Sequence, residues 1–212
     1  MVGDQTQSIT RTVAILGFGT VGQAVTRILG ARAGSELRIT HIYNRDVERK
    51  RVEWAPSGVV WTDDIEAVLA SQVDVVVELI GGLNPATEWI RRALQSGKSV
   101  VTANKQVIAQ YGDELGKLIV GGNQYLRFEA AVAGGIPIIR ALQDGLAGDN
   151  LFRVRGILNG TCNFVLTRME ANQVTFGDAL KEAQSLGFAE ADPTADVDGF
   201  DAQAKLAILS SV

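Results

Sequence analysis

A short apolar run stands directly before a glycine-rich turn near the start of this chain. Residues 13–16 are apolar and include two β-branched residues, which is typical of a strand buried on both faces of a parallel sheet. Residues 17–22 read Gly-Phe-Gly-Thr-Val-Gly, and apolar residues then recur at helical spacing as far as residue 29. A strand, a glycine turn and a helix in this order favour the binding of a dinucleotide.

Each glycine of this turn has its own expected role. Gly17 permits the tight turn, Gly19 lets the backbone approach a pyrophosphate, and Gly22 lets the helix pack close to the strand. The free N–H groups and the positive dipole end of the helix then meet the phosphates. The alternative is a glycine turn that holds no ligand. The cofactor-binding residues predicted for this turn are Gly17, Gly19, Thr20, Val21 and Gly22.

The composition of the 212 residues is that of a globular protein, with 46% hydrophobic and 21% charged residues. The net charge of −4 provides no basic surface for nucleic acid, and no apolar run is long enough to span a membrane. A single cysteine excludes an internal disulfide framework. Residues 1–10 lack the layout of a signal peptide and are expected to form a disordered lead. These features predict a cytoplasmic protein without nucleic-acid or membrane partners.

Six short strands are predicted to alternate with helices along residues 11–147. The predicted strands cover residues 13–16, 37–44, 58–61, 73–79, 99–102 and 126–128. Strands and helices that alternate in this way form a parallel, doubly wound sheet of the Rossmann type. The predicted fold class is therefore α/β, with a dinucleotide-binding domain over residues 11–147.

A second, smaller domain is predicted for residues 148–212. Its start is placed at the turn that begins with Gly148. Residues 152–158 alternate between polar and apolar side chains, which is the pattern of a half-exposed antiparallel strand. Helices follow, and Thr175 is expected to cap one of them. We expect an incomplete α+β domain that serves substrate binding and dimerisation.

The end of the second predicted strand bears on the choice of dinucleotide. NAD sites usually carry an acidic residue near this point, which accepts hydrogen bonds from the ribose hydroxyl groups. This chain has Asn44 and Arg45 there instead. The guanidinium of Arg45 favours the 2′-phosphate of NADP, whereas the alternative is that Arg45 is solvated or caps the next helix. We predict NADP, with NAD as the alternative.

Two lysines, Lys105 and Lys205, are candidates for a functional site. Lys105 follows the fifth predicted strand and faces the same crevice as the glycine turn. Lys205 lies one helical turn after Asp201, so the two side chains share a helix face. Residues 187–205 contain five acidic residues in all. The spacing fits a solvated ion pair, and it fits equally a buried lysine that acts as a general acid beside acids that hold a substrate ammonium.

Two further features have a plain and a functional interpretation. Residues 128–137 are small and apolar and contain glycine, with Glu129 as the single acid. Their spacing favours a tight loop over a cation site formed by carbonyl oxygens. Cys162 is predicted to be a packed residue rather than a nucleophile, because no histidine is placed to activate it.

Taken in order, these motifs make the chain resemble homoserine dehydrogenase from the glycine turn to the last residue. The matching pieces are the glycine turn, Glu78-Leu79-Ile80-Gly81-Gly82, Thr102-Ala103-Asn104-Lys105, residues 129–137, Asn159-Gly160-Thr161 and the acidic segment from Glu190 to Lys205. The acidic segment is far more specific than the glycine turn.

The resemblance implies that the protein interconverts L-aspartate 4-semialdehyde and L-homoserine with a nicotinamide cofactor, a step toward threonine, methionine and isoleucine. It implies that Lys205 donates a proton to the aldehyde oxygen, and that Lys105 lies beside the nicotinamide and the substrate and is a second catalytic residue. The predicted substrate-binding residues are Glu190, Asp196 and Asp201. The resemblance also implies a homodimer for the full-length protein.

Further ligand contacts follow from the same resemblance. The predicted cofactor contacts beyond the glycine turn are Arg45, Ile80, Ala103, Lys105 and Gly187. The residues that match a structural sodium site are Glu129, Val132, Gly134 and Ile136, the last three through their carbonyl oxygens. This match replaces the plain loop that the spacing alone favours.

Two departures from the family pattern affect the interpretation. Cys162 stands where the family often has threonine. The chain ends at Val212, soon after Lys205 and inside a predicted helix, whereas relatives continue, so we expect a fragment of a longer enzyme. Two alternatives stay open, namely a cofactor-binding fragment or sensor without turnover and a related NAD(P)-dependent reductase of another small substrate.

Overall fold

The computed structural model describes residues 10–32 and 36–212. Contacts divide the chain into two compact units, one that ends at Ala131 and one that covers Val132–Val212. The lead predicted for residues 1–10 lies outside the described residues, except for Thr10. Within the described ranges, no helix has both the length and the apolar character needed to cross a membrane.

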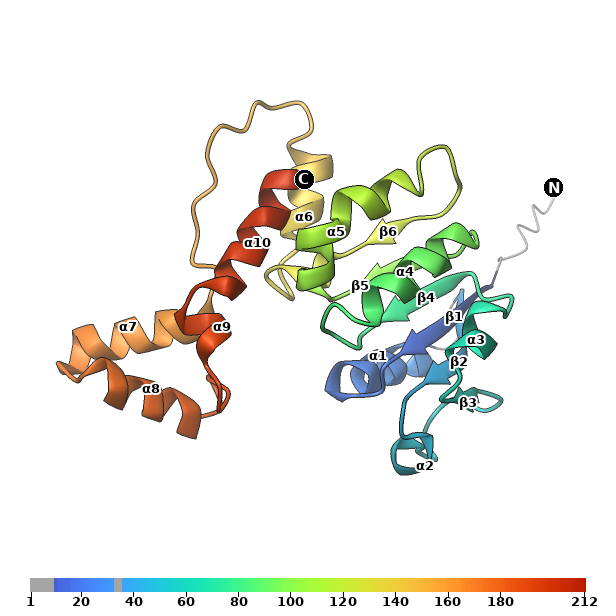
Figure 1. Cartoon of the computed structure of the whole chain (residues 1–212), viewed down its shortest axis with the longest axis horizontal. Coiled ribbons are helices and arrows are strands. Elements are labelled where there is room, and N and C mark those ends of the chain that lie inside the picture. The colour runs from blue at the N-terminus through green and yellow to red at the C-terminus, as the bar shows by residue number, and fades with distance from the viewer. Residues whose placement is uncertain (1–9, 33–35) are drawn as a thin grey trace, which may run out of the picture. The chain divides into compact units, whose positions relative to one another are not determined.

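The first unit contains a six-stranded parallel sheet (Figure 1). Its strands are β1 (Arg11–Leu16), β2 (Leu37–Tyr43), β3 (Val60–Thr62), β4 (Val75–Glu78), β5 (Ser99–Thr102) and β6 (Leu126–Arg127). They lie side by side in the order β3-β2-β1-β4-β5-β6. The prediction of six strands in a doubly wound parallel sheet is confirmed, with small shifts at the strand ends.

Helices connect the strands of the first unit. They are α1 (Thr20–Ala31), α2 (Val47–Lys50), α3 (Ile65–Leu69), α4 (Ala86–Gln95), α5 (Lys105–Lys117) and the short 3-10 helix η1 (Glu129–Ala131). The order of the strands reverses at β1, so right-handed crossovers place α1 on one face of the sheet and α4 and α5 on the other. In sheets of this kind, ligands bind at the carboxyl ends of the strands beside the reversal, which here lies between β1 and β4.

The core of the first unit is centred on β1. Ala14, Ile15 and Leu16 are fully buried, and β1 is paired with β2 on one side and with β4 on the other. Phe18, inside the glycine turn, is also fully buried, and its ring meets that of Trp61 at a centroid distance of 4.8 Å. Burial of Phe18 therefore ties the turn to the core on which β1 rests.

The described elements of the second unit are helices. They are α6 (Ile138–Arg140), the π-helix η2 (Ala141–Gly145), α7 (Gly160–Asn172), α8 (Phe176–Ser185), α9 (Thr194–Val197) and α10 (Phe200–Ser211). α7 and α8 pack against each other through the buried residues Val165, Ala179 and Ala183. Thr175 caps α8, as predicted, by accepting a hydrogen bond from the backbone N–H of Asp178.

The antiparallel strand predicted for residues 152–158 is wrong. This segment has no regular secondary structure, and Phe152 and Ile157 are 94% and 77% exposed. A strand needs a neighbouring strand for its backbone N–H and C=O groups. All strands among the described residues belong to the sheet of the first unit. The alternating pattern marks a segment that is able to pair, but it does not supply a partner.

The contacts divide the chain earlier than the predicted boundary between residues 147 and 148. Leu142 and Leu146, which precede that boundary, line a pocket together with Leu209 and Val212. The segment before Gly148 therefore packs with the second unit, because its leucine side chains lie beside those of α10.

Candidate functional site

Two close backbone contacts shape the glycine turn between β1 and α1. Gly17 has a φ of 99°, and a Cβ atom there would lie 2.7 Å from the carbonyl oxygen of Leu79. A Cβ atom at Gly22 would lie 2.1 Å from the carbonyl oxygen of Gly17. Both distances are well inside van der Waals contact, so the tight turn and the close helix packing each depend on glycine.

Open space surrounds Gly19, the second glycine of the turn. A Cβ atom at Gly19 would meet no atom within 4 Å, and no side chain caps the start of α1. Thr20 and Val21 are exposed beside it. The first N–H groups of a helix have no partner within the helix and carry the positive end of its dipole. The turn therefore fits an anionic group such as a pyrophosphate.

A buried carboxylate lies at the carboxyl end of β4. Glu78 is fully buried, and its Oε1 accepts hydrogen bonds from the backbone N–H groups of Ile80 at 2.8 Å and Gly81 at 3.2 Å. Its Oε2 accepts a hydrogen bond of 2.5 Å from the hydroxyl group of Thr102 on β5. The sequence placed Glu78 only within a family motif. An acidic residue at the end of an otherwise apolar strand is the sequence signal that could have indicated a buried carboxylate that binds the following loop.

The start of α5 is held beside the same loop. Asn104 caps α5 by accepting a hydrogen bond of 3.3 Å from the backbone N–H of Val107, and it donates one of 2.7 Å to the carbonyl oxygen of Gly82. Lys105 is the first residue of α5 and is half-buried, and Ala103 precedes the cap. The predicted contacts Ile80 and Ala103 thus lie on the loops that follow β4 and β5, and Lys105 lies at the start of α5, as ligand contacts of such sheets do.

The residues after β2 carry a positive charge. Arg45 is exposed directly beyond β2, whereas Asp46 is used as the cap of α2 and accepts a hydrogen bond from the backbone N–H of Arg49 at 3.3 Å. Burial raises the pKa of Tyr43, and the positive charge of Arg45 partly opposes that rise. The alternative in which Arg45 caps the helix is wrong because Asp46 is the cap, and the exposure of Arg45 fits both a solvated side chain and a ligand of a phosphate group.

The second unit contains a buried ion pair on α10. The ammonium group of Lys205 lies 2.6 Å from Oδ2 of Asp201 and donates a second hydrogen bond of 2.7 Å to the carbonyl oxygen of Leu158. The side chains of Lys205 and Asp201 are only 19% and 4% exposed. Of the two interpretations that the sequence left open, the structure excludes the solvated surface pair.

Asn159, directly before α7, joins two carboxylates. Its Nδ2 donates hydrogen bonds to Oδ2 of Asp201 at 2.8 Å and to Oδ1 of Asp196 at 2.7 Å. Its Oδ1 accepts one of 2.8 Å from the backbone N–H of Cys162, which caps α7. Ionised carboxylates only accept hydrogen bonds, so this orientation of the amide is the one that satisfies all three partners. The sequence named Asn159 only as part of a motif, although an asparagine before a helix already indicates a cap.

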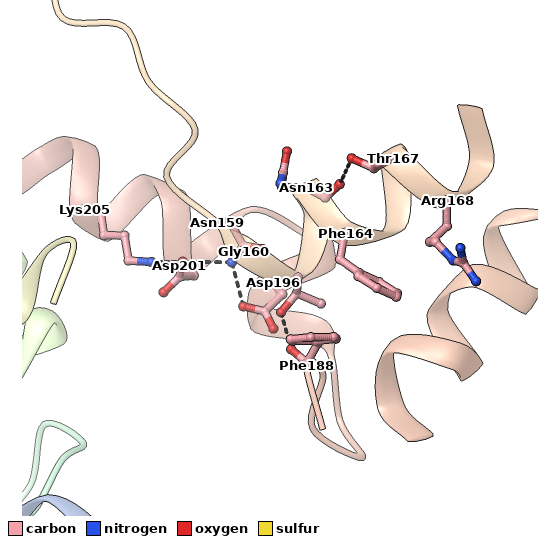
Figure 2. A pocket seen from close by; sticks show the side chains of 11 residues that line it. Asn159, Gly160, Asn163, Phe164, Thr167, Arg168, Phe188, Asp196, Asp201 and Lys205 are labelled. Atoms are coloured by element: carbon pink, nitrogen blue, oxygen red, sulfur yellow. Dashed lines mark hydrogen bonds and ion pairs between the residues drawn. The ribbon is translucent and has the colours of Figure 1, made fainter. Parts of the chain in front are cut away.

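These side chains line a cavity of about 580 Å³. Figure 2 shows Lys205, Asp201 and Asn159 converging from α10 and the start of α7, with Asp196 beside them. Phe164 and Phe188 form part of the wall, with ring centroids 4.9 Å apart. The cavity therefore combines the ammonium group of Lys205, the guanidinium of Arg168, two carboxylates and apolar surface, which suits a small polar ligand with charged groups.

Two family models match the chain. The model described as homoserine dehydrogenase, NAD binding domain, matches residues 17–129, which is more than half of the 212 residues. The chain belongs to the homoserine dehydrogenase family. A second model, described as homoserine dehydrogenase, matches residues 137–212. Both units are thus covered by models of the same family.

Relatives and solved structures agree with this family. The homoserine dehydrogenase of Neisseria gonorrhoeae is 44% identical over 94% of this chain and 47% of the relative. The crystal structure of a homoserine dehydrogenase from Thiobacillus denitrificans is 44% identical, has a TM-score of 0.82 and is matched over 95% of this chain and 48% of that one. A hyperthermophilic archaeal homoserine dehydrogenase in complex with NADPH is 33% identical, has a TM-score of 0.81 and is matched over 94% and 68%. The chain spans about half the length of the curated relatives it matches.

Two residues that the resemblance to homoserine dehydrogenase implicates lie outside the lining of this cavity. Glu190 is exposed, and its backbone carbonyl accepts a hydrogen bond of 3.1 Å from the side chain of Gln184. Gly187 follows α8 with a φ of 77°. Substrate contact at Glu190 and cofactor contact at Gly187 stay predictions.

The segment that matches a sodium site in homoserine dehydrogenases begins at η1. Glu129 belongs to the first unit, whereas Val132, Gly134 and Ile136 belong to the second. Within residues 10–32 and 36–212, no three side chains of His, Cys, Asp or Glu gather as metal ligands. A cation at this segment would depend on carbonyl oxygens, which are ligands that suit a hard cation. The sodium site stays a prediction.

Cys162, where the family often has threonine, is half-buried at the start of α7. Its thiol donates to the carbonyl oxygen of Asp196 at 3.1 Å. Burial raises the pKa of this thiol, and the negative charges of Asp196 and Asp201 raise it further. A thiol held in its neutral form is a poor nucleophile, which agrees with the packed role predicted from the sequence.

Proposed function

We propose that this protein interconverts L-aspartate 4-semialdehyde and L-homoserine with NADPH or NADP as the redox partner. The observation that carries the proposal is the buried pair of Lys205 and Asp201 at the wall of the cavity. Membership of the homoserine dehydrogenase family supports the choice of substrate. Such an enzyme would act in the cytoplasm, on the route to threonine, methionine and isoleucine.

Reduction of the aldehyde requires a hydride at the carbonyl carbon and a proton at the oxygen. When bound, NADPH would supply the hydride. Lys205 donates the proton from Nζ to the oxygen as the C=O π bond breaks, and its positive charge stabilises the negative charge that develops there. In the reverse direction, the neutral amine of Lys205 accepts the hydroxyl proton. Asp201 holds the nitrogen in place through its bond of 2.6 Å.

Carboxylates in the second unit would bind the amino group of the substrate. Asp196 lines the cavity and is held by Asn159 at 2.7 Å, so its charge is available at a fixed position. Asp201 and Glu190 complete the acidic set that the family motif implies. An ammonium ligand binds best where carboxylates are already oriented, because less side-chain freedom is lost on binding.

The glycine turn of the first unit would hold the cofactor. The open space at Gly19 and the uncapped start of α1 support a pyrophosphate there, and Lys105 would lie beside the nicotinamide. The exposed guanidinium of Arg45 supports NADP over NAD. Replacing Arg45 with alanine is expected to weaken NADPH binding while NADH binding is unchanged. Equal losses for the two cofactors in fluorescence titrations would contradict this preference.

Two further features are proposed by likeness to the family. The carboxylate of Glu129 and the carbonyl oxygens of Val132, Gly134 and Ile136 would hold a sodium ion. Replacing sodium with tetramethylammonium in the buffer should then lower thermal stability in wild type but not in Glu129→Gln. The full-length protein would be a homodimer, which sedimentation velocity tests by its mass.

The reaction is tested by a comparison of substrates. The absorbance of NADPH at 340 nm would be followed with L-aspartate 4-semialdehyde and with matched aldehydes that lack the amino group. The proposal predicts consumption of NADPH and formation of L-homoserine only with the first. Equal rates with all aldehydes would favour a reductase of another substrate, and binding of NADPH without turnover would favour a cofactor-binding module.

A further inference from the structure

A hydrogen-bond network begins at the carboxylate of Glu78 and crosses two strands of the first unit. We propose that Glu78 is a positioning residue of the cofactor site. Its carboxylate couples the loop after β4 to the start of α5, and it thereby fixes Lys105 relative to the glycine turn. The inference rests on the cofactor site proposed above, and it assigns a residue outside the expected ligand contacts.

The carboxylate of Glu78 sets the loop after β4. Glu78 is fully buried, yet both of its oxygens accept hydrogen bonds. Two of the donors are the consecutive backbone N–H groups of Ile80 and Gly81, at 2.8 and 3.2 Å. A buried carboxylate that binds two consecutive amides fixes the path of the backbone between them, because moving the loop would leave a charge without partners.

Thr102 carries the network from β4 to β5. Glu78 and Thr102 face each other in the register of the parallel sheet, at the carboxyl ends of their strands. The hydroxyl group of Thr102 donates to Oε2 of Glu78 at 2.5 Å and accepts a hydrogen bond of 2.9 Å from the backbone N–H of Asn104. The hydroxyl group of Thr102 therefore links the carboxylate that holds the loop after β4 to the backbone of the loop after β5.

Asn104 closes the network. Its side chain donates to the carbonyl oxygen of Gly82 at 2.7 Å, so it contacts the far end of the loop that Glu78 organises. The same side chain caps α5 through the backbone N–H of Val107, and α5 begins with Lys105. The position of Lys105 thus depends on two connections to the loop after β4, one through Thr102 and one direct.

The loop after β4 also forms a wall of the glycine turn. The backbone N–H of Leu79 donates to the carbonyl oxygen of Leu16 at 2.8 Å, and the carbonyl oxygen of Leu79 is the atom that a Cβ at Gly17 would strike. Leu79 lies in the sequence between Glu78 and the two amides that bind its carboxylate, so Glu78 connects the contact with the glycine turn to the network that ends at α5. Glu78 therefore fixes the position of the glycine turn relative to the start of α5.

The charge of the carboxylate matters for this role. The partners of Glu78 present N–H and O–H groups to its two oxygens, and an ionised carboxylate only accepts. Glutamine has the same shape, but its amide nitrogen then faces the hydroxyl group of Thr102, whose proton loses its acceptor. The loss of one well-placed hydrogen bond at a buried site is expected to weaken NADPH binding about tenfold.

The test compares four single variants and the double variant that combines Glu78→Gln with Thr102→Val. Glu78→Gln and Thr102→Val break the network on either side of the 2.5 Å bond, whereas Thr102→Ser keeps the hydroxyl group. Ser71→Ala is the matched control, because Ser71 is half-buried in the same unit and its hydroxyl group donates to the carbonyl oxygen of Val68 in α3, away from the network. The readouts are the Kd for NADPH from fluorescence titration and the amide hydrogen exchange of residues 79–82 and 103–107.

We expect Glu78→Gln and Thr102→Val each to raise the Kd about tenfold, the double variant to raise it no further, and exchange to increase in both segments. Thr102→Ser and Ser71→Ala should leave both readouts as in wild type. Increased exchange confined to residues 79–82, or additive losses in the double variant, would overturn the inference. Wild-type binding of NADPH without turnover would contradict the proposed reaction and leave this inference standing, whereas a wild type that does not bind NADPH would overturn the inference.

Discussion

The carboxamide of Asn159 serves two purposes at the residue scale. Its oxygen caps α7, and its nitrogen bonds to the carboxylates of Asp196 and Asp201. Lys205 is bound to the same oxygen of Asp201 that Asn159 contacts. The amide nitrogen of Asn159 therefore holds the carboxylate of Asp201, which in turn holds the ammonium group of Lys205. A mutation can separate this role from the capping of α7.

Asn159→Ser separates them, because serine is a good cap but is too short to bridge the two carboxylates. We expect turnover to fall by about tenfold or more while the free energy of unfolding changes by less than about 1 kcal/mol. Thr175→Ala is the matched control, since it removes the cap of α8 without contact to the cavity. It should cost about 1 kcal/mol of stability and leave turnover unchanged. Parallel losses of stability and turnover in both variants would contradict the assignment.

Asp74 provides a prediction about pH. Hydrogen bonds from the backbone N–H of Thr12 and from its hydroxyl group lower the pKa of Asp74 below its ordinary value of 3.8, with a smaller effect of Arg11. Because the folded pKa is depressed, the ionised group stabilises the fold above pH 3.8, and this contribution is lost as the pH falls through the folded pKa.

Asp74→Asn should therefore lower the free energy of unfolding at pH 7 by about 1 kcal/mol, a value reduced for its partial exposure. The difference from wild type should shrink as the pH falls below 3.8. Urea unfolding at several pH values measures it. A difference that stays constant into the acid range would show that the charge of Asp74 is not its source.

At the scale of elements, two glycines at the junction of the glycine turn and α1 have different roles. Gly22 is needed so that α1 can approach the turn, since a Cβ there would lie 2.1 Å from the carbonyl oxygen of Gly17. Gly19 is surrounded by space and adopts a φ of −80°, which alanine tolerates. One glycine therefore serves the fold and the other leaves room for a ligand.

Gly22→Ala is expected to lower the free energy of unfolding by about 1–3 kcal/mol, because α1 must move away from the turn. Gly19→Ala should leave stability near that of wild type and weaken NADPH binding about tenfold or more, because its methyl group enters the space for the pyrophosphate. Thermal unfolding and NADPH titration of both variants measure the two effects. Undiminished binding by Gly19→Ala would mean that the phosphates do not lie there.

The sheet could be predicted from the sequence because its signals are local. β1, β4 and β5 each contain a short apolar run, and the glycine turn occurs between a strand and a helix, so hydrophobic pattern and turn chemistry agree. The segment of residues 152–158 shows the opposite case. Its alternation is as regular as that of a strand, but pairing depends on a partner that the pattern does not contain.

At the scale of the whole molecule, the site depends on contacts between segments far apart in the sequence. Lys205 and Asp201 could be placed on one helix face from spacing alone, but their burial depends on the carbonyl oxygen of Leu158 and on the side chain of Asn159. Glu78 was likewise visible as an acid in a motif, whereas its partner Thr102 became apparent only from the register of β4 and β5. Sequence spacing predicts which residues share one face of an element, whereas the residues that contact this face are known only from the fold.

The central claim is that Lys205 supplies the proton in a reduction that uses NADPH. The most direct test measures the loss of NADPH absorbance with L-aspartate 4-semialdehyde for wild type and Lys205→Ala, together with the Kd for NADPH of both. The account predicts a fall in turnover of about 10²- to 10⁴-fold in the variant with NADPH binding unchanged. Turnover in Lys205→Ala close to that of wild type would contradict the claim.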